Sequence, residues 1–454
     1  MLGQERIKEI ADSILAESTA DQTEVVIQTT DSALTRFANS SIHQNVAETD
    51  ASVSIRVVLA DPAGAGARIG VASTNSLDRV ALFHTLGAAL SIARLQPPNP
   101  DFRSLPGPRP IVQVAAFSEA TAGCTPEKRA RGAGAICLLA RAAGLVAAGA
   151  LTTAALELAV ANSLGVFAYH RTTQADINTV IMGDTSSGYA AAFALDVNDL
   201  DFEAIGREAL EKCVKSRDPR PLEPGEYTVI LEPYAVQDFL QMMTWTGFSA
   251  VALQEGRSFM AGKIGQPIVD PRVSIWDDGL SPDGVPLPFD FEGVPKQRVD
   301  LIENGVARGV VYDSYSAGKE EGKTSTGHAL PAPNTFGPLP LNLFFGSGDA
   351  TLEEMIRSTE RGIYVTRFHY TRPVDPTRVV ITGMTRDGTF LIEKGEIAYP
   401  VRNLRFTQSY LEALNHLDSI GRDTRLLTGM GGVACDRMPA LKVHQFRFTG
   451  ATEF

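Results

Sequence analysis

The chain has 454 residues, too many for one ordinary hydrophobic core, so the sequence predicts two or more domains. A hydrophobic fraction of 44% and a charged fraction of 21% are those of a soluble globular protein and argue against disorder. With 41 basic and 53 acidic residues, the net charge of −12 argues against direct binding of nucleic acid or of an anionic membrane.

The N-terminal part alternates between helical and strand patterns. Apolar residues recur at helical spacing from Ile7 to Leu15, which predicts an amphipathic helix. Alternating or β-branched runs then predict strands at 24–27, 33–38, 42–46, 53–57 and 68–72. Ser76 is a candidate cap for a second helix that continues to about residue 94.

A proline-rich loop at 97–110 separates this region from a second group of elements. The patterns there predict helices at 125–143 and 201–215 and strands at 146–158, 165–171 and 177–182. The run 218–224 contains three prolines and is the best candidate for a domain boundary. We therefore expect an N-terminal α/β domain at 1–217 and a second domain at 222–454.

The signals change to β-rich after this boundary. Asn304-Gly305 lies between two alternating runs and predicts a hairpin, and Asp387-Gly388 and Lys394-Gly395 repeat the device. Helices are expected at 233–253 and 352–361. The fold class is therefore predicted to be α+β, with an α/β sandwich-like N-terminal domain followed by a β-rich, antiparallel, barrel-like C-terminal domain.

The sequence also bears on the compartment. No secretory signal or membrane span is visible, and no dense basic run suggests a membrane surface. The four cysteines lack Cys-x-x-Cys pairing, as expected in a reducing compartment. We expect a cytoplasmic protein.

Short segments recur in a fixed order along most of the chain. They are 36–38 with 42–44, 70–74, 256–259, 262–265, 289–295, 302–305, 325–327, 362–364 and 391–397. In their order and spacing they resemble the TldD/PmbA family, also called modulators of DNA gyrase. Asp290 and Glu292 lie within one of these segments and are expected to cap a glycine turn, although contact with a substrate backbone is the alternative.

Catalytic members of that family carry a His-Glu-x-x-x-His zinc motif on the helix after the strand that corresponds to 226–231. The helix that begins at Tyr234 contains no histidine, and no two of the seven histidines stand four or five residues apart. The third zinc ligand of TldD-type members is a cysteine near the C-terminus, and Cys435 occupies a similar place. Asp436 and Arg437 follow it where catalytic members have Gly and Lys, so Cys435 is a weak metal candidate and an idle buried thiol is favoured.

Five residues are candidates for contact with a substrate in one shared cavity. They are Arg257, Phe259, His328, His369 and Tyr370. A polar and aromatic mixture suits peptide contacts. The alternative is that Phe259 and Tyr370 pack in the core while Arg257 and His328 cap turns. A noncanonical metal site built from His328, His369 and either Cys435 or His444 is a further alternative.

The resemblance implies a TldE/PmbA-like, non-catalytic subunit that forms a heterodimer with a TldD-like chain and acts on unfolded peptides. No cofactor is expected in this chain, and zinc is expected in the catalytic partner. Two alternatives are an autonomous metallopeptidase with a noncanonical metal site and a stand-alone homodimeric regulator, for example of gyrase. Whether the chain is an enzyme by itself is left open.

Overall fold

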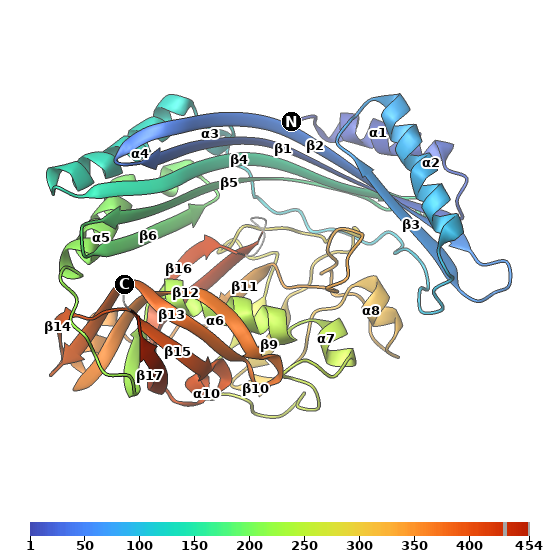
Figure 1. Ribbon diagram of the computed structural model, residues 1–454. Coiled ribbons are helices and arrows are strands. Elements are labelled where there is room, and N and C mark those ends of the chain that lie inside the picture. Colours follow the sequence, from blue (N-terminus) through green and yellow to red (C-terminus); the bar gives the residue numbers. More distant parts are fainter. Residues whose placement is uncertain (430–433, 453–454) are drawn as a thin grey trace.

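The computed structural model describes residues 1–429 and 434–452. A long, curved N-terminal sheet arches over a compact C-terminal β domain (Figure 1). The predicted α+β class is confirmed, and the strands form two separate sheets.

The N-terminal sheet has six antiparallel strands in the order β3-β2-β1-β4-β5-β6. Their bounds are β1 Gln22–Ala38, β2 Ser41–Ala60, β3 Ala67–Thr74, β4 Val146–Asn162, β5 Phe167–Met182 and β6 Ser187–Ala194. The runs predicted at 24–27 and 33–38 are one strand. Asp31, between those runs, pairs with Thr49 on one side and Ala155 on the other, because a central strand has its backbone groups bonded on both edges.

Helices cover the convex face of this sheet (Figure 1). They are α1 Gln4–Glu17, α2 Arg79–Leu95, α3 Glu119–Ala122, α4 Pro126–Ala142 and α5 Phe202–Lys215. Alternation along β1 explains the layering. Val25 and Ile27 pack under α1 and α2, whereas Val26 points to the concave face and packs with Phe289 and Phe291 of the C-terminal domain.

The C-terminal domain contains a closed ring of strands. They are β7 Glu226–Leu231, β12 Arg361–Asp375, β13 Val380–Glu393, β15 Leu404–Ser409 and β17 Cys435–Ala451. The ring closes because β7 pairs with both β12 and β17, so the barrel-like prediction is confirmed. The antiparallel prediction needs a correction, because the β7–β12 and β11–β17 pairs are parallel.

Further strands extend this sheet. They are β8 Ile275–Asp277, β9 Val299–Glu303, β10 Val306–Ala307, β11 Asn342–Phe345, β14 Glu396–Pro400 and β16 Leu417–Thr428. The predicted Asn-Gly hairpin joins β9 to β10, with Asn304 and Gly305 both at positive φ.

The helices of this domain are α6 Pro233–Gly247, α7 Ala250–Gln254, α8 Ser314–Gly318, α9 Leu352–Arg357 and α10 Tyr410–Asn415. The helices predicted at 233–253 and 352–361 are both shorter than expected, and α8 and α10 were not predicted. The helix expected at 233–253 breaks after α6. The carbonyl of Phe248 and the amide of Ala250 bond to the backbone of Val311 instead of continuing the helical ladder.

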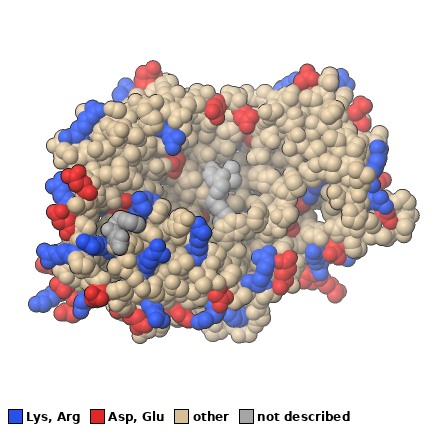
Figure 2. All heavy atoms as spheres, viewed as in Figure 1, with Lys and Arg blue, Asp and Glu red and all other residues tan. Residues whose placement is uncertain are grey.

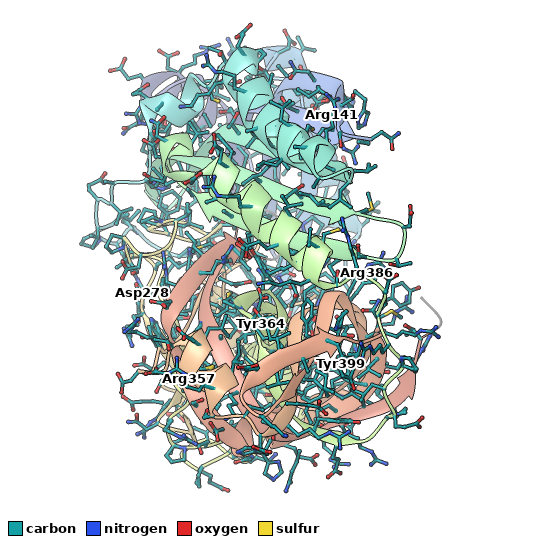
Figure 3. The ribbon with its side chains drawn as sticks, turned by 90° about the vertical axis from the view of Figure 1, so that its left-hand side faces the viewer. Arg141, Asp278, Arg357, Tyr364, Arg386 and Tyr399 are labelled. Carbon is teal, nitrogen blue, oxygen red and sulfur yellow. The ribbon has the colours of Figure 1, made fainter. Side chains whose placement is uncertain are left out.

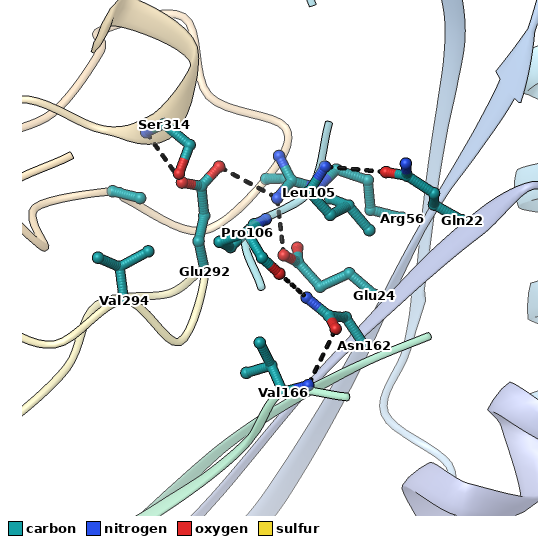
Figure 4. Close-up of polar contacts among 12 residues, drawn as sticks. Gln22, Glu24, Arg56, Leu105, Pro106, Asn162, Val166, Glu292, Val294 and Ser314 are labelled. Carbon is teal, nitrogen blue, oxygen red and sulfur yellow. Dashed lines mark hydrogen bonds and ion pairs between the residues drawn. The ribbon is translucent and has the colours of Figure 1, made fainter. Parts of the chain in front are cut away.

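Polar contacts join the two domains at both ends of the arch. At one end Arg56 of β2 lies 2.7 Å from Glu24 of β1 and 3.1 Å from Glu292 of the C-terminal domain (Figure 4). At the other end Lys212 of α5 contacts Glu232 at 2.7 Å. The concave face is thus held over the barrel from two sides.

Candidate functional site

Helix α6 directly follows β7, so it is the helix on which the resemblance to the TldD/PmbA family would place the zinc motif. Pro233 at its first turn starts the helix, because the proline ring fixes a helical φ and its missing N–H leaves no bond unmade. Gln237 donates from Nε2 to Asp436 Oδ2 at 3.1 Å and to the carbonyl of Thr428 at 2.8 Å. Gln241, one turn further along α6, also hydrogen-bonds Asp436. Burial raises the pKa of Asp436 to about 6.

Cys435 lies beside this contact at the start of β17 and is 1% exposed. Its Sγ accepts a hydrogen bond from the Val285 amide at 3.2 Å and contacts Asn342 Nδ2 at 3.5 Å. Burial raises the pKa of this thiol to about 11, so it stays protonated at neutral pH. Zinc binds the thiolate, and no cluster of three or more His, Cys, Asp or Glu side chains suited to a metal occurs among the residues described. The donors around Cys435 do not fit a zinc ion.

A buried ionic cluster lies next to Cys435. Asp277 accepts a hydrogen bond from His328 Nε2 at 2.7 Å and from the Asn342 amide at 2.7 Å, and Lys296 Nζ lies 3.9 Å away. All three ionisable side chains are fully buried. Burial opposes ionisation of Asp277, yet Lys296 and His328 hold its pKa below the usual range. Burial and the charge of Lys296 lower the pKa of His328.

The structure separates the predicted contact residues. Phe259 is 1% exposed and packs edge-on against Phe248, with ring centroids 5.6 Å apart. His328 is fully buried in the cluster with Asp277. Without accessible surface, neither side chain contacts a peptide in this conformation. Arg257 lies on the surface, where it pairs with Glu255 at 2.5 Å.

His369 and Tyr370 are brought together on β12. Their ring centroids are 6.1 Å apart, and Tyr370 is 65% exposed, contrary to the core position considered for it. Arg372 lies over the Tyr370 ring at 4.5 Å. Contact of His369 or Tyr370 with a substrate stays a prediction, as does a role for Arg257.

The two acidic residues of the 289–295 segment, Asp290 and Glu292, have different roles. Asp290 Oδ1 accepts the amides of Glu292 and Val294 at 2.9 Å each, which is the expected turn cap. Glu292 instead reaches Arg56 and the Ser314 amide. Sequence reasoning missed Arg56 and Lys296, because their partners are distant in the chain and no local spacing marks them.

The two domains enclose a hollow, whose visible walls are mainly uncharged (Figure 2). A cavity of about 50 Å³ lies where the concave face of β1, β4 and β5 meets the loop 285–287. His170 Nε2 donates across it to the carbonyl of Pro286 at 3.0 Å, and burial lowers the pKa of this histidine. The concave face therefore forms one wall of the interior between the domains.

None of the helices in the described part of the chain is both long and apolar enough to cross a membrane.

Three family models match most of the chain. They are the PmbA/TldA metallopeptidase domain 1 at residues 23–93, the central domain at 129–217 and the C-terminal domain at 224–450. A metalloprotease of Methanothermobacter thermautotrophicus is 27% identical over 268 residues, which are 58% of this chain and 58% of that protein. The match thus spans less than two thirds of that relative. The metalloprotease PmbA of Escherichia coli O157:H7 is 24% identical over 391 residues, 83% of each chain.

Two solved structures share the fold. TldE from Thermococcus kodakarensis has a TM-score of 0.88 at 22% identity, with 98% of this chain and 99% of that chain covered. A Thermotoga maritima protein described as a candidate modulator of a DNA gyrase has a TM-score of 0.86 at 21% identity, with 98% and 100% covered. The three matching models together cover most of the chain and show that this chain belongs to the PmbA/TldD metallopeptidase family.

Proposed function

We propose that this chain is a TldE/PmbA-like, non-catalytic subunit of a cytoplasmic TldD/TldE-type metallopeptidase complex that acts on unfolded peptides. The observation that carries the proposal is the polar face of α6. Catalytic relatives need two histidines on that helix, whereas Gln237 here is engaged by Asp436 and the Thr428 carbonyl. An amide that already donates to a carboxylate offers no ligand pair to zinc.

The zinc would belong to a TldD-like partner subunit. When bound there, zinc supplies a polarised water for peptide hydrolysis. This chain would contribute walls to a common chamber, and its concave sheet and the hollow of Figure 2 suit that role. Direct binding of nucleic acid is not part of the proposal, because the net charge is −12.

The first test measures zinc and activity in the isolated chain. After dialysis we expect well below one equivalent of zinc and no cleavage of an unstructured peptide. Cys435→Ser should change neither metal content nor stability appreciably, because the serine hydroxyl can accept the same Val285 amide. Stoichiometric zinc with chelator-sensitive cleavage would instead establish the autonomous metallopeptidase with a noncanonical site.

The second test adds a TldD-like chain from the same organism. We expect a heterodimer on size exclusion and a peptidase activity higher than that of either chain alone. The matched control is the same mixture with the partner's zinc removed by chelation. Persistent homodimers of this chain that ignore such a partner but bind gyrase would favour the stand-alone regulator.

A further inference from the structure

A large cavity lies at the junction of the two domains, away from α6. It has a volume of about 1010 Å³, and it is bounded by the β5–β6 turn and residues 216–219 on one side. Strands β12 and β13 and residues 401–403 bound it on the other side. Figure 3 shows Arg386 at this junction, between α5 and the barrel strands. The volume is that of a small-ligand site, for which about 300–1,000 Å³ is usual.

The charged side chains of this cavity differ between its two sides. The side formed by the β5–β6 turn and residues 216–219 contributes the carboxylates of Asp184 and Asp218, and the C-terminal domain contributes Arg367, Arg386 and Arg402 together with Asp387. Arg367 is neutralised locally, because its Nε donates to the buried Asp387 at 2.6 Å. Arg386 and Arg402 are exposed, and they leave the C-terminal wall with a net positive charge.

No ion pair between described residues bridges the two walls. Asp218 accepts from Thr185 at 3.1 Å, and Asp184 has no cation within 4 Å in the described parts of the chain. Arg386 lies 4.0 Å from Asp387, and Asp387 already accepts a hydrogen bond from Arg367. The cavity therefore presents carboxylates on one side and guanidinium groups on the other, with their charges uncompensated across the gap.

The positions of the arginines support an anionic ligand group. Arg367 and Arg386 are directly opposed on β12 and β13, and Asp387 bonds Arg367 at 2.6 Å and lies 4.0 Å from Arg386. Arg386 and Arg402 keep guanidinium N–H groups that a ligand carboxylate could accept. A simple anion would use only this wall and leave Asp184 and Asp218 without a counter-charge.

We propose that this cavity binds a short zwitterionic peptide, with its carboxylate on Arg386 and Arg402 and its ammonium group on Asp184 and Asp218. Short peptides with two free ends are the chemical class that hydrolysis of longer peptides releases. The inference goes beyond the proposed function, because it assigns ligand binding to this chain alone and requires neither zinc nor a partner.

The test is calorimetric titration of the isolated, full-length chain with trialanine. Saturable binding at millimolar concentration is expected. N-acetyl-trialanine and trialanine amide should each bind about tenfold more weakly, the loss expected for one charge-assisted contact. Equal binding of the doubly capped peptide, or no binding of trialanine, would overturn the proposal.

Paired variants assign each end of the ligand. The double variant Arg386→Gln and Arg402→Gln should weaken the binding of trialanine about tenfold but leave the affinity for trialanine amide unchanged. The double variant Asp184→Asn and Asp218→Asn should weaken the binding of trialanine to the same degree but leave the affinity for N-acetyl-trialanine unchanged. These side chains are exposed, so the folds should be retained. Arg422→Gln, on an exposed β16 arginine 3.7 Å from Asp423 and outside the cavity lining, is the matched control. If either double variant lost affinity for trialanine amide and for N-acetyl-trialanine to the same degree, the assignment of the two ligand ends would be contradicted.

Discussion

Among single residues, Asp277 is a buried carboxylate near the candidate site that is held by several partners. It is fully buried, and its compensation comes from His328, the Asn342 amide and the more distant Lys296. His328→Ala should lower the free energy of unfolding by about 3–5 kcal/mol, the usual loss when one partner of a buried charged contact is removed. Urea denaturation at neutral pH measures the change.

The matched control for that prediction is His369→Ala. His369 is only partly buried on β12 and is joined to no carboxylate within 4 Å among the described residues, so its removal should cost about 0.5 kcal/mol or less. Losses of equal size in the two variants would show that the hydrogen bond to Asp277 carries no special stability.

The same residues show what the sequence could reveal about the site. The absence of a histidine pair is visible directly, because spacing on one helix is a local property. The burial of His328 and Phe259 is not local. His328 contacts Asp277, and Phe259 contacts Phe248, only in the folded chain. Residue type alone therefore predicted that these two side chains line a cavity, whereas the structure buries them in the core.

At the scale of elements, Asp238 ties α6 to its neighbours. Thr371 of β12 donates to Asp238 Oδ2 at 2.6 Å, and Tyr410 of α10 donates to Oδ1. Burial raises the pKa of Asp238 from 3.8 to about 6. Folding therefore favours the protonated carboxyl. Its contribution to stability is full below pH 4 and is lost as the pH rises to about 6.

Asp238→Asn should remove this pH dependence. The amide oxygen can still accept from Tyr410, and the Thr371 hydroxyl can accept from the new N–H. Relative to the native chain, the variant should gain about 2 kcal/mol of unfolding free energy between pH 4 and pH 7, less than the full conversion because Asp238 keeps some solvent contact. Denaturation of both chains across this range measures the difference. A constant difference at every pH would mean that Asp238 has the same pKa folded and unfolded.

Elements defined by local signals were predicted well, and those defined by partners were not. The Asn304-Gly305 turn needs positive φ at both residues, a requirement that the dipeptide itself reveals. The end of α6 before Phe248 depends on backbone bonds to Val311, and closure of the barrel depends on β7 meeting β17. Those partners lie far along the chain, so the periodicity within either segment does not predict them.

At the scale of the whole molecule, ion pairs hold the arched sheet on the barrel. Each end of the arch carries a charged contact to the C-terminal domain: Arg56 with Glu292 at one end, and Arg425 with Glu208 at the other. These contacts fix the placement of the two domains relative to each other.

Among the described residues, Arg56 is the single cation that pairs with both Glu24 and Glu292, whose side chains are only 2% and 8% exposed. Arg56→Met would leave these two carboxylates buried without a counter-charge. We expect a loss of about 3–5 kcal/mol in unfolding free energy at neutral pH. Burial already raises the pKa of Glu24, so the loss should shrink as the pH falls and the carboxyls are protonated.

Two further chains decide whether charge is the cause. Adding Glu24→Gln and Glu292→Gln to Arg56→Met removes the uncompensated charges and should restore much of the stability, because replacing every member of a buried ion group is far less costly than removing one. Arg298→Met, which breaks an exposed 3.0 Å pair with Asp300, should change stability by about 0.5 kcal/mol or less. Arg56→Met could instead lose unfolding free energy by the same amount at every pH, with no recovery in the triple variant. Arg56 would then stabilise the domain contact by the packing of its side chain rather than by its charge.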